Sequence, residues 1–278
     1  MSINNSIDVS VVMACRNSDK KLLTGAILSV LNQSLSKFEF IIVDDGSEKP
    51  LECEINYMED KRIRLLRISP SGLGAALNHG VSMAQGKYIA RIDDDDVMAM
   101  NRLVKQLYYL ENNQDVVCVG SQIFLQYNKK YVAYRRYPLS HDLILKDLMK
   151  VKFSIAHPAV MFRKDTFEKI NGYRVSGGGQ DLDLFLQFAL HGALANIDDN
   201  LIYYNLSNGL SVNFPVEKYK AYLFALKDVL DNDAFYAYRD QMQKSIDVLE
   251  EKIKRKKHFS IKRYALRKYV QLFGRSMS

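Results

Sequence analysis

The stretch YIARIDDDD, residues 88–96, joins an apolar strand pattern to four consecutive carboxylates. Two carboxylates about 4 Å apart repel each other by roughly 4 kcal/mol at an effective dielectric constant near 20, so four of them need either full solvation or a cation. Mg²⁺ and Mn²⁺ accept such oxygen ligands. Side chains alternate along an extended chain, so we expect Asp93 and Asp95 to share one face as metal ligands while Asp94 and Asp96 point elsewhere. A solvated acidic loop, or Asp96 as the N-cap of the next helix, is the alternative interpretation.

Hydrophobic patterning around this stretch alternates between strands and helices. Short apolar runs predict strands, and apolar residues at helical spacing predict helices. The strands are expected at residues 8–14, 38–43, 63–68 and 88–92, and the helices at residues 22–32 and 71–84. Such an alternation predicts a mostly parallel sheet whose ligand lies outside the carboxyl ends of the strands. The acidic pair Asp44-Asp45 and the four-carboxylate run both follow strands.

Five segments, in this order and spacing, resemble glycosyltransferase family 2, the inverting nucleotide-sugar enzymes that include bacterial polysaccharide and O-antigen glycosyltransferases. The segments are VSVVM (9–13), SVLNQS (29–34), FEFIIVDDGS (38–47), GLGAALN (72–78) and GKYIARIDDDD (86–96). The resemblance implies an α/β GT-A fold, a Rossmann-like and mostly parallel sheet flanked by helices. Residues 1–100 would then form the nucleotide-sugar-binding half and residues 101–212 the acceptor-binding half. A helical basic tail is expected over residues 213–278.

The resemblance also implies a donor site. Asp45 is the expected partner of the nucleotide base, because a carboxylate accepts the ring N–H of uracil. The segment Asp93 to Asp95 matches the DxD motif of the family, whose last carboxylate holds the metal that bridges the diphosphate, so Asp95 is the first choice of ligand and Asp93 the second. The complete expected donor-binding set is Ala14, Asn17, Asp44, Asp45, Gly72, Asp93, Asp94 and Asp95. The composition of residues 44–47 is also typical of a simple turn.

The second half of the chain resembles the acceptor side of the same family. The matching segments are HPAVMFR (157–163), NGYR (171–174) and GGGQDLDL (177–184). Gln180 replaces a Glu frequent in relatives, whereas Asp181 keeps the Asp that is assigned there as general base. Asp183 is the alternative base or an acceptor contact, and helix N-capping ahead of residues 182–190 is the other role open to both. His157 is an acceptor or phosphate contact, or a structural residue.

Basic residues concentrate at the C-terminus. The formal net charge is +7, yet ten of the 39 Lys and Arg residues fall within residues 252–278, which contain no Asp or Glu. Apolar residues recur between these charges at helical spacing, as in helices that lie on anionic bilayers. They are Ile261, Tyr264, Ala265, Leu272 and Phe273. We expect peripheral membrane contact through residues 252–275, or packing of this stripe on the body. Because no nucleic-acid motif accompanies the charge, no nucleic-acid partner is expected.

Length and composition set the remaining limits. A chain of 278 residues with 47% hydrophobic residues can bury a substantial core. We find no signal-peptide pattern and no apolar run of membrane-spanning length, and the three cysteines lack metal-binding spacing. The expected location is therefore cytoplasmic, peripheral at the inner face of the cell membrane.

These features predict an inverting, metal-dependent glycosyltransferase that moves a hexose from a nucleotide sugar, expected to be a UDP-hexose, to a lipid-linked saccharide acceptor in surface polysaccharide synthesis. Two other interpretations stay open. One is a catalytically inactive nucleotide-binding module, which Gln180 favours. The other is a nucleotidyltransferase acting on a sugar phosphate, but the ACRNS segment at residues 14–18 lacks the Gly-rich loop with Arg and Lys expected after its first strand.

Overall fold

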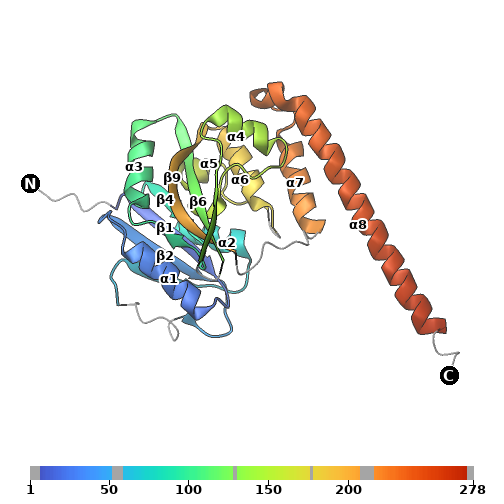
Figure 1. The fold of residues 1–278 in the computed structure, drawn as a ribbon, viewed down its shortest axis with the longest axis horizontal. Coiled ribbons are helices and arrows are strands. Elements are labelled where there is room, and N and C mark those ends of the chain that lie inside the picture. The colour runs from blue at the N-terminus through green and yellow to red at the C-terminus, as the bar shows by residue number, and fades with distance from the viewer. Residues whose placement is uncertain (1–6, 52–58, 128–129, 176–177, 207–215, 274–278) are drawn as a thin grey trace, which may run out of the picture.

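The structure is a computed structural model that describes residues 7–51, 59–127, 130–175, 178–206 and 216–273. Nine strands in these residues form one sheet in the order β3-β2-β1-β4-β8-β6-β9-β5, with β7 paired to β6 (Figure 1). The strands are β1 Val9–Cys15, β2 Phe38–Asp44, β3 Ile63–Arg67, β4 Tyr88–Arg91, β5 Val97–Met98, β6 Val116–Tyr127, β7 Lys130–Arg135, β8 Met161–Arg163 and β9 Ala193–Asn205. The helices are α1 Lys20–Leu31, α2 Leu73–Ser82, α3 Arg102–Asn112, α4 His141–Leu148, α5 Lys164–Lys169, α6 Gln180–Ala189, α7 Val216–Val229 and α8 Arg239–Phe273, with 3-10 turns η2 His157–Ala159 and η3 Asp233–Tyr238.

The first half of the sheet is parallel, as the alternating pattern predicts. β1 lies between β2 and β4 and runs parallel to both, and β2 is parallel to β3. Beyond β4 the sheet is mixed, because β8 runs antiparallel to both β4 and β6. The expected α/β fold with a helical C-terminal region is confirmed. The boundaries at residues 100 and 212 stay predictions.

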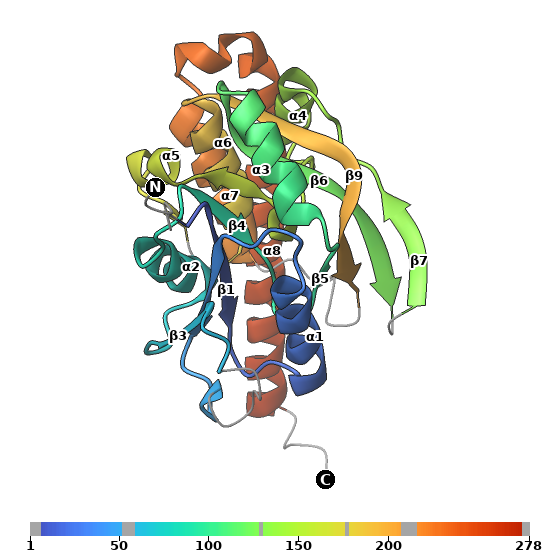
Figure 2. The same ribbon diagram turned by 90° about the vertical axis from the view of Figure 1, so that its left-hand side faces the viewer.

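Both faces of the sheet are covered, which explains the continuous apolar runs in its strands. Successive residues of β1 enter two different cores: Val9, Val11 and Met13 pack with α1 and α3, whereas Val12 and Ala14 pack with α2 and α6 (Figure 2). Burial of both faces leaves the strand ends and their loops as the places where polar side chains gather. In β1 and β6, Cys15 and Cys118 are buried free thiols, and Cys53 lies outside the described residues.

The C-terminal helices are partly built into this body. α7 packs against α6 and α8. The first half of α8 buries Met242, Ile246, Leu249 and Ile253, whose spacing defines one helical face. Its second half extends away from the body in Figure 1. The side chains of the expected apolar stripe at residues 261–273 lie outside the described part of the chain. Among the described residues, no helix is long and apolar enough to cross a membrane.

Candidate active site

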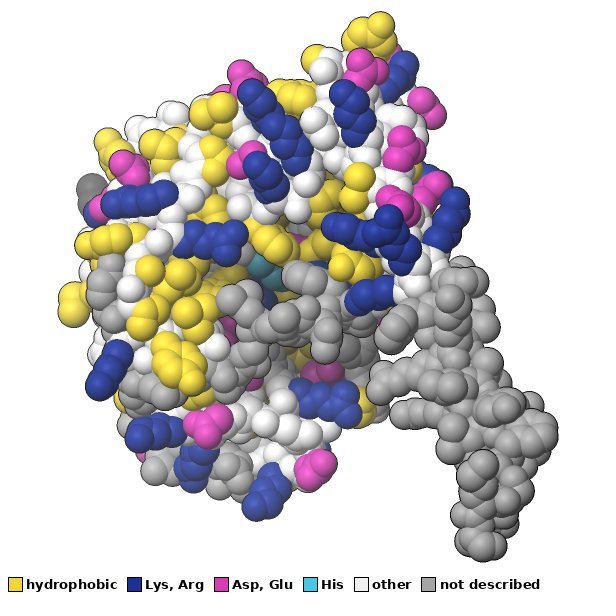
Figure 3. All heavy atoms as spheres, turned by 45° about the vertical axis from the view of Figure 1, so that its right-hand side comes forward, with side chains coloured by type: hydrophobic (Ala, Val, Ile, Leu, Met, Phe, Trp, Pro, Cys, Tyr) yellow, Lys and Arg dark blue, Asp and Glu magenta, His cyan; other side chains and the backbone are white. Residues whose placement is uncertain are grey.

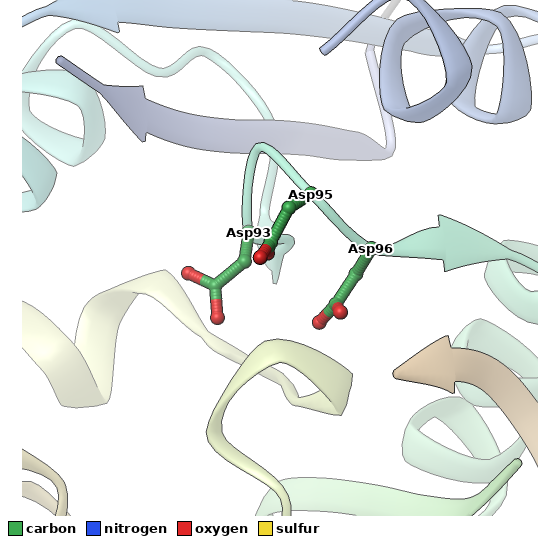
Figure 4. A group of neighbouring side chains, drawn as sticks. All are labelled: Asp93, Asp95 and Asp96. Carbon is green, nitrogen blue, oxygen red and sulfur yellow. The ribbon is translucent and has the colours of Figure 1, made fainter. Parts of the chain in front are cut away.

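Three of the four carboxylates after β4 converge. The strand ends at Arg91, and the chain then turns so that the backbone N–H of Asp96 donates to the carbonyl oxygen of Asp93 (3.4 Å). One carboxylate oxygen from each of Asp93, Asp95 and Asp96 lies within 4.8 Å of the others (Figure 4). The expectation that Asp96 points away with Asp94 is wrong, because a turn rather than an extended strand sets these side-chain directions.

Asp96 is also not a helix cap. The N-cap of α3 is Asn101, and its side chain makes no capping hydrogen bond. Asp96 is instead buried, and its Oδ1 accepts the backbone N–H of Asn205 (2.8 Å). Its Oδ2 is buried and has no hydrogen-bond partner among the described residues. A buried carboxylate oxygen without a donor is costly unless it is protonated or faces a cation.

Crowding changes the proton affinity of this cluster. Burial, together with the charges of Asp93 and Asp94, raises the pKa of Asp95 to about 6. Burial and the charge of Asp93 also raise the pKa of Asp96 well above its ordinary value. A divalent cation relieves the same repulsion, and three close carboxylate oxygens are a donor set that Mg²⁺ and Mn²⁺ accept. The residues present therefore fit a hard divalent ion, with Asp96 added to the two expected ligands.

Arg91 places a buried positive charge against the cluster, and sequence analysis assigned it no role. Its Nη1 donates to Oδ2 of Asp93 (3.0 Å), and its Nη2 pairs with Oδ1 of the same carboxylate. Behind it, Nη2 of the buried Arg102 donates to the carbonyl oxygen of Arg91 (2.8 Å). The available signal was an arginine within a strand buried on both faces, since a buried charge needs a partner.

Asp94 leaves the cluster and faces the loop that follows β1. Its carboxylate accepts a hydrogen bond from the hydroxyl of Ser18. This bond joins the loops after β1 and β4, which end at the same edge of the sheet because the two strands are parallel neighbours. Asp94 is therefore placed at the expected donor side, and a direct nucleotide contact by it stays a prediction.

The two expected nucleoside residues end β2 with different partners. Asp44 is fully buried. Its carboxylate accepts a hydrogen bond from the backbone N–H of Ser47 (2.8 Å) and forms an ion pair with Arg67 (3.2 Å). Asp45 accepts the backbone N–H groups of Ser71 (2.6 Å) and Gly72 (2.9 Å). Asp45 thus connects the end of β2 to the start of α2. Base recognition by Asp45 stays a prediction.

The loop after β1 is tied to the same turn. Asn17 accepts the backbone N–H of Glu48 through its Oδ1 (2.8 Å), and its own N–H donates to the Ser47 hydroxyl (2.9 Å). Gly46 has a positive φ of 70°, and a Cβ there would lie 2.5 Å from Cδ of Pro70. Glycine therefore lets the loops after β2 and β3 approach each other. These contacts bring Asn17 close to the turn that follows Asp44 and Asp45, at the carboxyl ends of β1 and β2. Ala14, near the end of β1, lies at the same strand ends.

A cavity of about 320 Å³ opens beside the acidic turn. Its lining includes Lys21 and Gly25 of α1 together with Asp95, Val97 and Tyr203. The cavity thus brings a lysine from the start of α1 to the same space as one of the cluster carboxylates.

Two of the expected acceptor residues are engaged in structural contacts. Asp183 is 1% exposed and forms a two-point ion pair with Arg174, at 3.1 Å to Nε and 2.5 Å to Nη2. Nε2 of His157 lies 2.7 Å from the hydroxyl of Tyr173. Burial and the charge of Arg91 lower the pKa of His157 well below its ordinary value, so the ring is neutral. A role of either residue in acceptor binding or catalysis stays a prediction.

Asp181 is the expected general base, and that role stays a prediction. It lies in the first turn of α6, whose N-cap is Gly179, so neither this Asp nor Asp183 caps the helix. Its Oδ1 accepts the backbone N–H of Leu182 (3.0 Å). Burial raises its pKa above the ordinary value, against the opposing charges of Lys218 and Arg91. The charge of Arg91 also acts on Asp95 and Asp96 of the acidic cluster.

Comparison with known proteins agrees with this geometry. Residues 10–170 match the sequence pattern of Glycosyl transferase family 2. The chain belongs to this family. It is 31% identical to the O-antigen biosynthesis glycosyltransferase WbnJ of Escherichia coli over 232 residues, which cover 80% of this chain and 89% of that protein. It is 30% identical to the uncharacterized glycosyltransferase MJ1057 of Methanocaldococcus jannaschii, over 78% of this chain and 77% of that protein.

Solved structures show the same fold for this family 2 glycosyltransferase. Residues 1–349 of S. aureus TarS in complex with UDP-GlcNAc superpose with a TM-score of 0.71 and 16% sequence identity, covering 86% of this chain and 71% of that one. Another crystal structure of S. aureus TarS residues 1–349 superposes with a TM-score of 0.69 and 16% sequence identity, covering 92% of this chain and 75% of that one. At this level of identity the likeness establishes the fold.

Proposed function

We propose that this glycosyltransferase is an inverting, metal-dependent enzyme that transfers a hexose from UDP-hexose to a lipid-linked saccharide in surface polysaccharide synthesis. The observation that supports the proposal is the convergence of Asp93, Asp95 and Asp96 after β4, with a buried oxygen on Asp96 that has no hydrogen-bond partner among the described residues. The donor assignment is supported by the UDP-GlcNAc complex of TarS, and the acceptor class by the O-antigen role in the name of WbnJ.

In this proposal Asp181 is the general base. Its carboxylate takes the proton from the acceptor hydroxyl as that oxygen attacks the anomeric carbon of the donor sugar. The bond from the anomeric carbon to the diphosphate oxygen breaks, its electron pair leaves with UDP, and the configuration inverts. A raised pKa makes Asp181 a stronger base than an ordinary carboxylate, which favours this proton transfer. The neutral Gln180 beside it adds no competing charge.

The acidic turn serves the leaving group. Asp93, Asp95 and Asp96 would hold Mn²⁺ or Mg²⁺, which when bound stabilises the negative charge that develops on the diphosphate. Arg91 holds the Asp93 carboxylate in place through two nitrogen atoms. Asp44, Asp45 and the loop after β1 would bind the nucleoside at the ends of β1 and β2.

We further propose that residues 252–275 make peripheral contact with the inner face of the cell membrane. The run of positive charges supports this, since each basic residue near an anionic surface contributes about 1 kcal/mol. An acceptor anchored in that membrane would then reach the catalytic face from the side of α8.

Donor hydrolysis tests the catalytic proposal without knowledge of the acceptor. Purified full-length protein should slowly release UDP from UDP-glucose or UDP-GlcNAc in the presence of Mn²⁺, and excess EDTA should abolish the release. Asp95→Ala should lose most of this activity, whereas the matched control Asp231→Ala should retain it, because Asp231 is 92% exposed. Full activity in EDTA would exclude the metal role. Binding of UDP without turnover of any donor or acceptor would favour an inactive module.

A further inference from the structure

A second concave surface lies apart from the donor site, between the end of α4 and helices α7 and α8. It has a volume of about 360 Å³. Its lining combines three lysines, Lys150, Lys244 and Lys252, with three aromatic side chains, Phe153, Tyr219 and Tyr222. None of the residues that line it is acidic. We call this surface the α7–α8 groove.

The groove is built from one face of α8 and a strained turn. Ser245 of α8 donates its hydroxyl hydrogen to the carbonyl oxygen of Met149 (2.7 Å), which fixes the helix against the end of α4. There the backbone N–H of Val151 donates to Leu148 (2.8 Å) and that of Lys152 to Asp147 (2.9 Å). This hydrogen-bond pattern ends helices, usually with glycine in the left-handed position.

Val151 occupies that left-handed position, with a φ of 54°. A β-branched residue is rare there, because its side chain crowds the backbone. Val151 is also one of the residues that line the groove.

The lysines of the groove carry charge that no carboxylate neutralises. Among the described residues, Lys150, Lys244 and Lys252 form no ion pair. The acidic residues next to Lys252 are already engaged, since Glu250 pairs with Lys227 and Glu251 with Arg255. On the face that Figure 3 shows, Lys and Arg side chains lie among hydrophobic ones, with Asp and Glu side chains also present. The groove is therefore suited to an anionic ligand with a flat or apolar portion.

The groove shares part of its lining with a much smaller pocket of about 10 Å³ beside the proposed base, a space that fits a single hydroxyl group or water. Val151, Phe153 and Tyr222 line a smaller pocket as well, and Asp181 lines that pocket with them. The hydroxyl of Tyr222 is buried and has no hydrogen-bond partner among the described residues. Such a group is costly to bury unless a ligand or water satisfies it. Phe153 and Tyr222 thus belong both to the groove and to the pocket that Asp181 lines, whereas Lys150, Lys244 and Lys252 line the groove alone.

We propose that the α7–α8 groove binds the glycosyl diphosphate end of the acceptor. The acceptor sugar lies against Phe153 and Tyr222 with its reacting hydroxyl toward Asp181, and the diphosphate lies on Lys150 and Lys244. The apolar chain beyond the diphosphate leaves the groove near Lys252. This inference rests on the proposed function, because it assigns the acceptor subsite of the same reaction.

Calorimetry with a soluble acceptor mimic tests this assignment. The probe is decyl glucosyl diphosphate, compared with decyl glucoside, which lacks the diphosphate, and decyl diphosphate, which lacks the sugar. Full-length protein is titrated in EDTA, and again with saturating UDP and Mn²⁺. We expect the complete probe to bind more tightly than either fragment, and UDP not to displace it.

Variants locate the binding. Lys150→Gln and Lys244→Gln should each lower the affinity for decyl glucosyl diphosphate about tenfold, because each removes a charged hydrogen bond to phosphate. Lys61→Gln, an equal charge change at an exposed residue before the edge strand β3, should not. Tyr222→Phe removes only a hydroxyl, so it tests the sugar position even if a lysine variant misfolds. It should weaken decyl glucosyl diphosphate and leave decyl diphosphate unchanged.

Three results would overturn the assignment: no binding of the probe, displacement by UDP, or equal losses in Lys61→Gln and the groove variants. Binding of decyl diphosphate as tight as that of the complete probe would mean an anionic lipid site rather than an acceptor site. If any of these occurs while metal-dependent hydrolysis of UDP-hexose persists, the groove assignment fails and the proposed function stands. If hydrolysis is absent and the probe still binds in the groove, the proposed function fails, and the groove is a glycosyl diphosphate site that is not the acceptor subsite of this reaction.

Discussion

Neutralising Asp95 should stabilise the metal-free protein, although it removes an active-site carboxylate. In the folded chain its pKa is about 6, against an ordinary value of 3.8. Such a difference corresponds to about 3 kcal/mol at neutral pH. Asp95 is partly exposed, so solvent screening reduces the effect to about 1 kcal/mol. We therefore expect Asp95→Asn to raise the free energy of unfolding by about 1 kcal/mol at pH 8 in EDTA.

The sign of the pH dependence follows from the direction of the pKa change. A raised pKa means that the folded state holds the Asp95 proton more tightly than the unfolded state does. The destabilisation is therefore present in full above pH 6 and disappears as the pH falls from about 6 to about 4. The advantage of Asp95→Asn should shrink over the same range.

Urea unfolding with and without Mn²⁺ measures both effects. Mn²⁺ should stabilise the wild type at pH 8 and should do so less as protons compete for Asp95 below about pH 6. Asp95→Asn should lose most of this gain, whereas Asp231→Asn should behave as the wild type does. If Asp95→Asn instead destabilises the metal-free protein at pH 8, the carboxylates do not repel one another as described.

Three further predictions follow from the site and the tail. Asp181→Asn should lower kcat by about 10²- to 10⁴-fold with the KM for the donor unchanged. In the wild type, kcat should fall on the acid side at a higher pH than an ordinary Asp would give, because the pKa of Asp181 is raised. An unchanged kcat in Asp181→Asn would exclude Asp181 as the base. Asp183→Asn should lower the free energy of unfolding by about 3 kcal/mol through loss of the buried pair with Arg174, and wild-type stability in urea would contradict that structural role. Removal of residues 257–278 should spare the melting temperature, since Ile253 remains, but abolish co-sedimentation with phosphatidylglycerol vesicles at low salt; persistent co-sedimentation would place membrane contact elsewhere.

The parallel half of the fold could be predicted because its signals are local. Each strand from β1 to β4 is a short apolar run, and each connecting helix has its own spacing, so their order implies the sheet. The reversal at β8 could not be predicted in the same way. That strand has three residues, and its direction depends on pairing with both β4 and β6.

The sequence by itself determined which residues have the right chemistry. Consecutive carboxylates at a strand end, a second acidic pair after β2 and an Asp at a helix start are visible without coordinates. A resemblance to the family then supplied their expected roles. These features survive folding because strand ends meet at one edge of a parallel sheet whatever the details of packing.

The tertiary structure alone decided which partners each of these groups has. The turn after Ile92 brings Asp96 into the acidic cluster and directs Asp94 toward Ser18. Arg174 forms an ion pair with Asp183, whereas burial raises the pKa of Asp181. Such distinctions depend on burial and on partners far apart in the chain. A one-dimensional pattern carries neither, because the free energy of a buried charge is set by its surroundings in space.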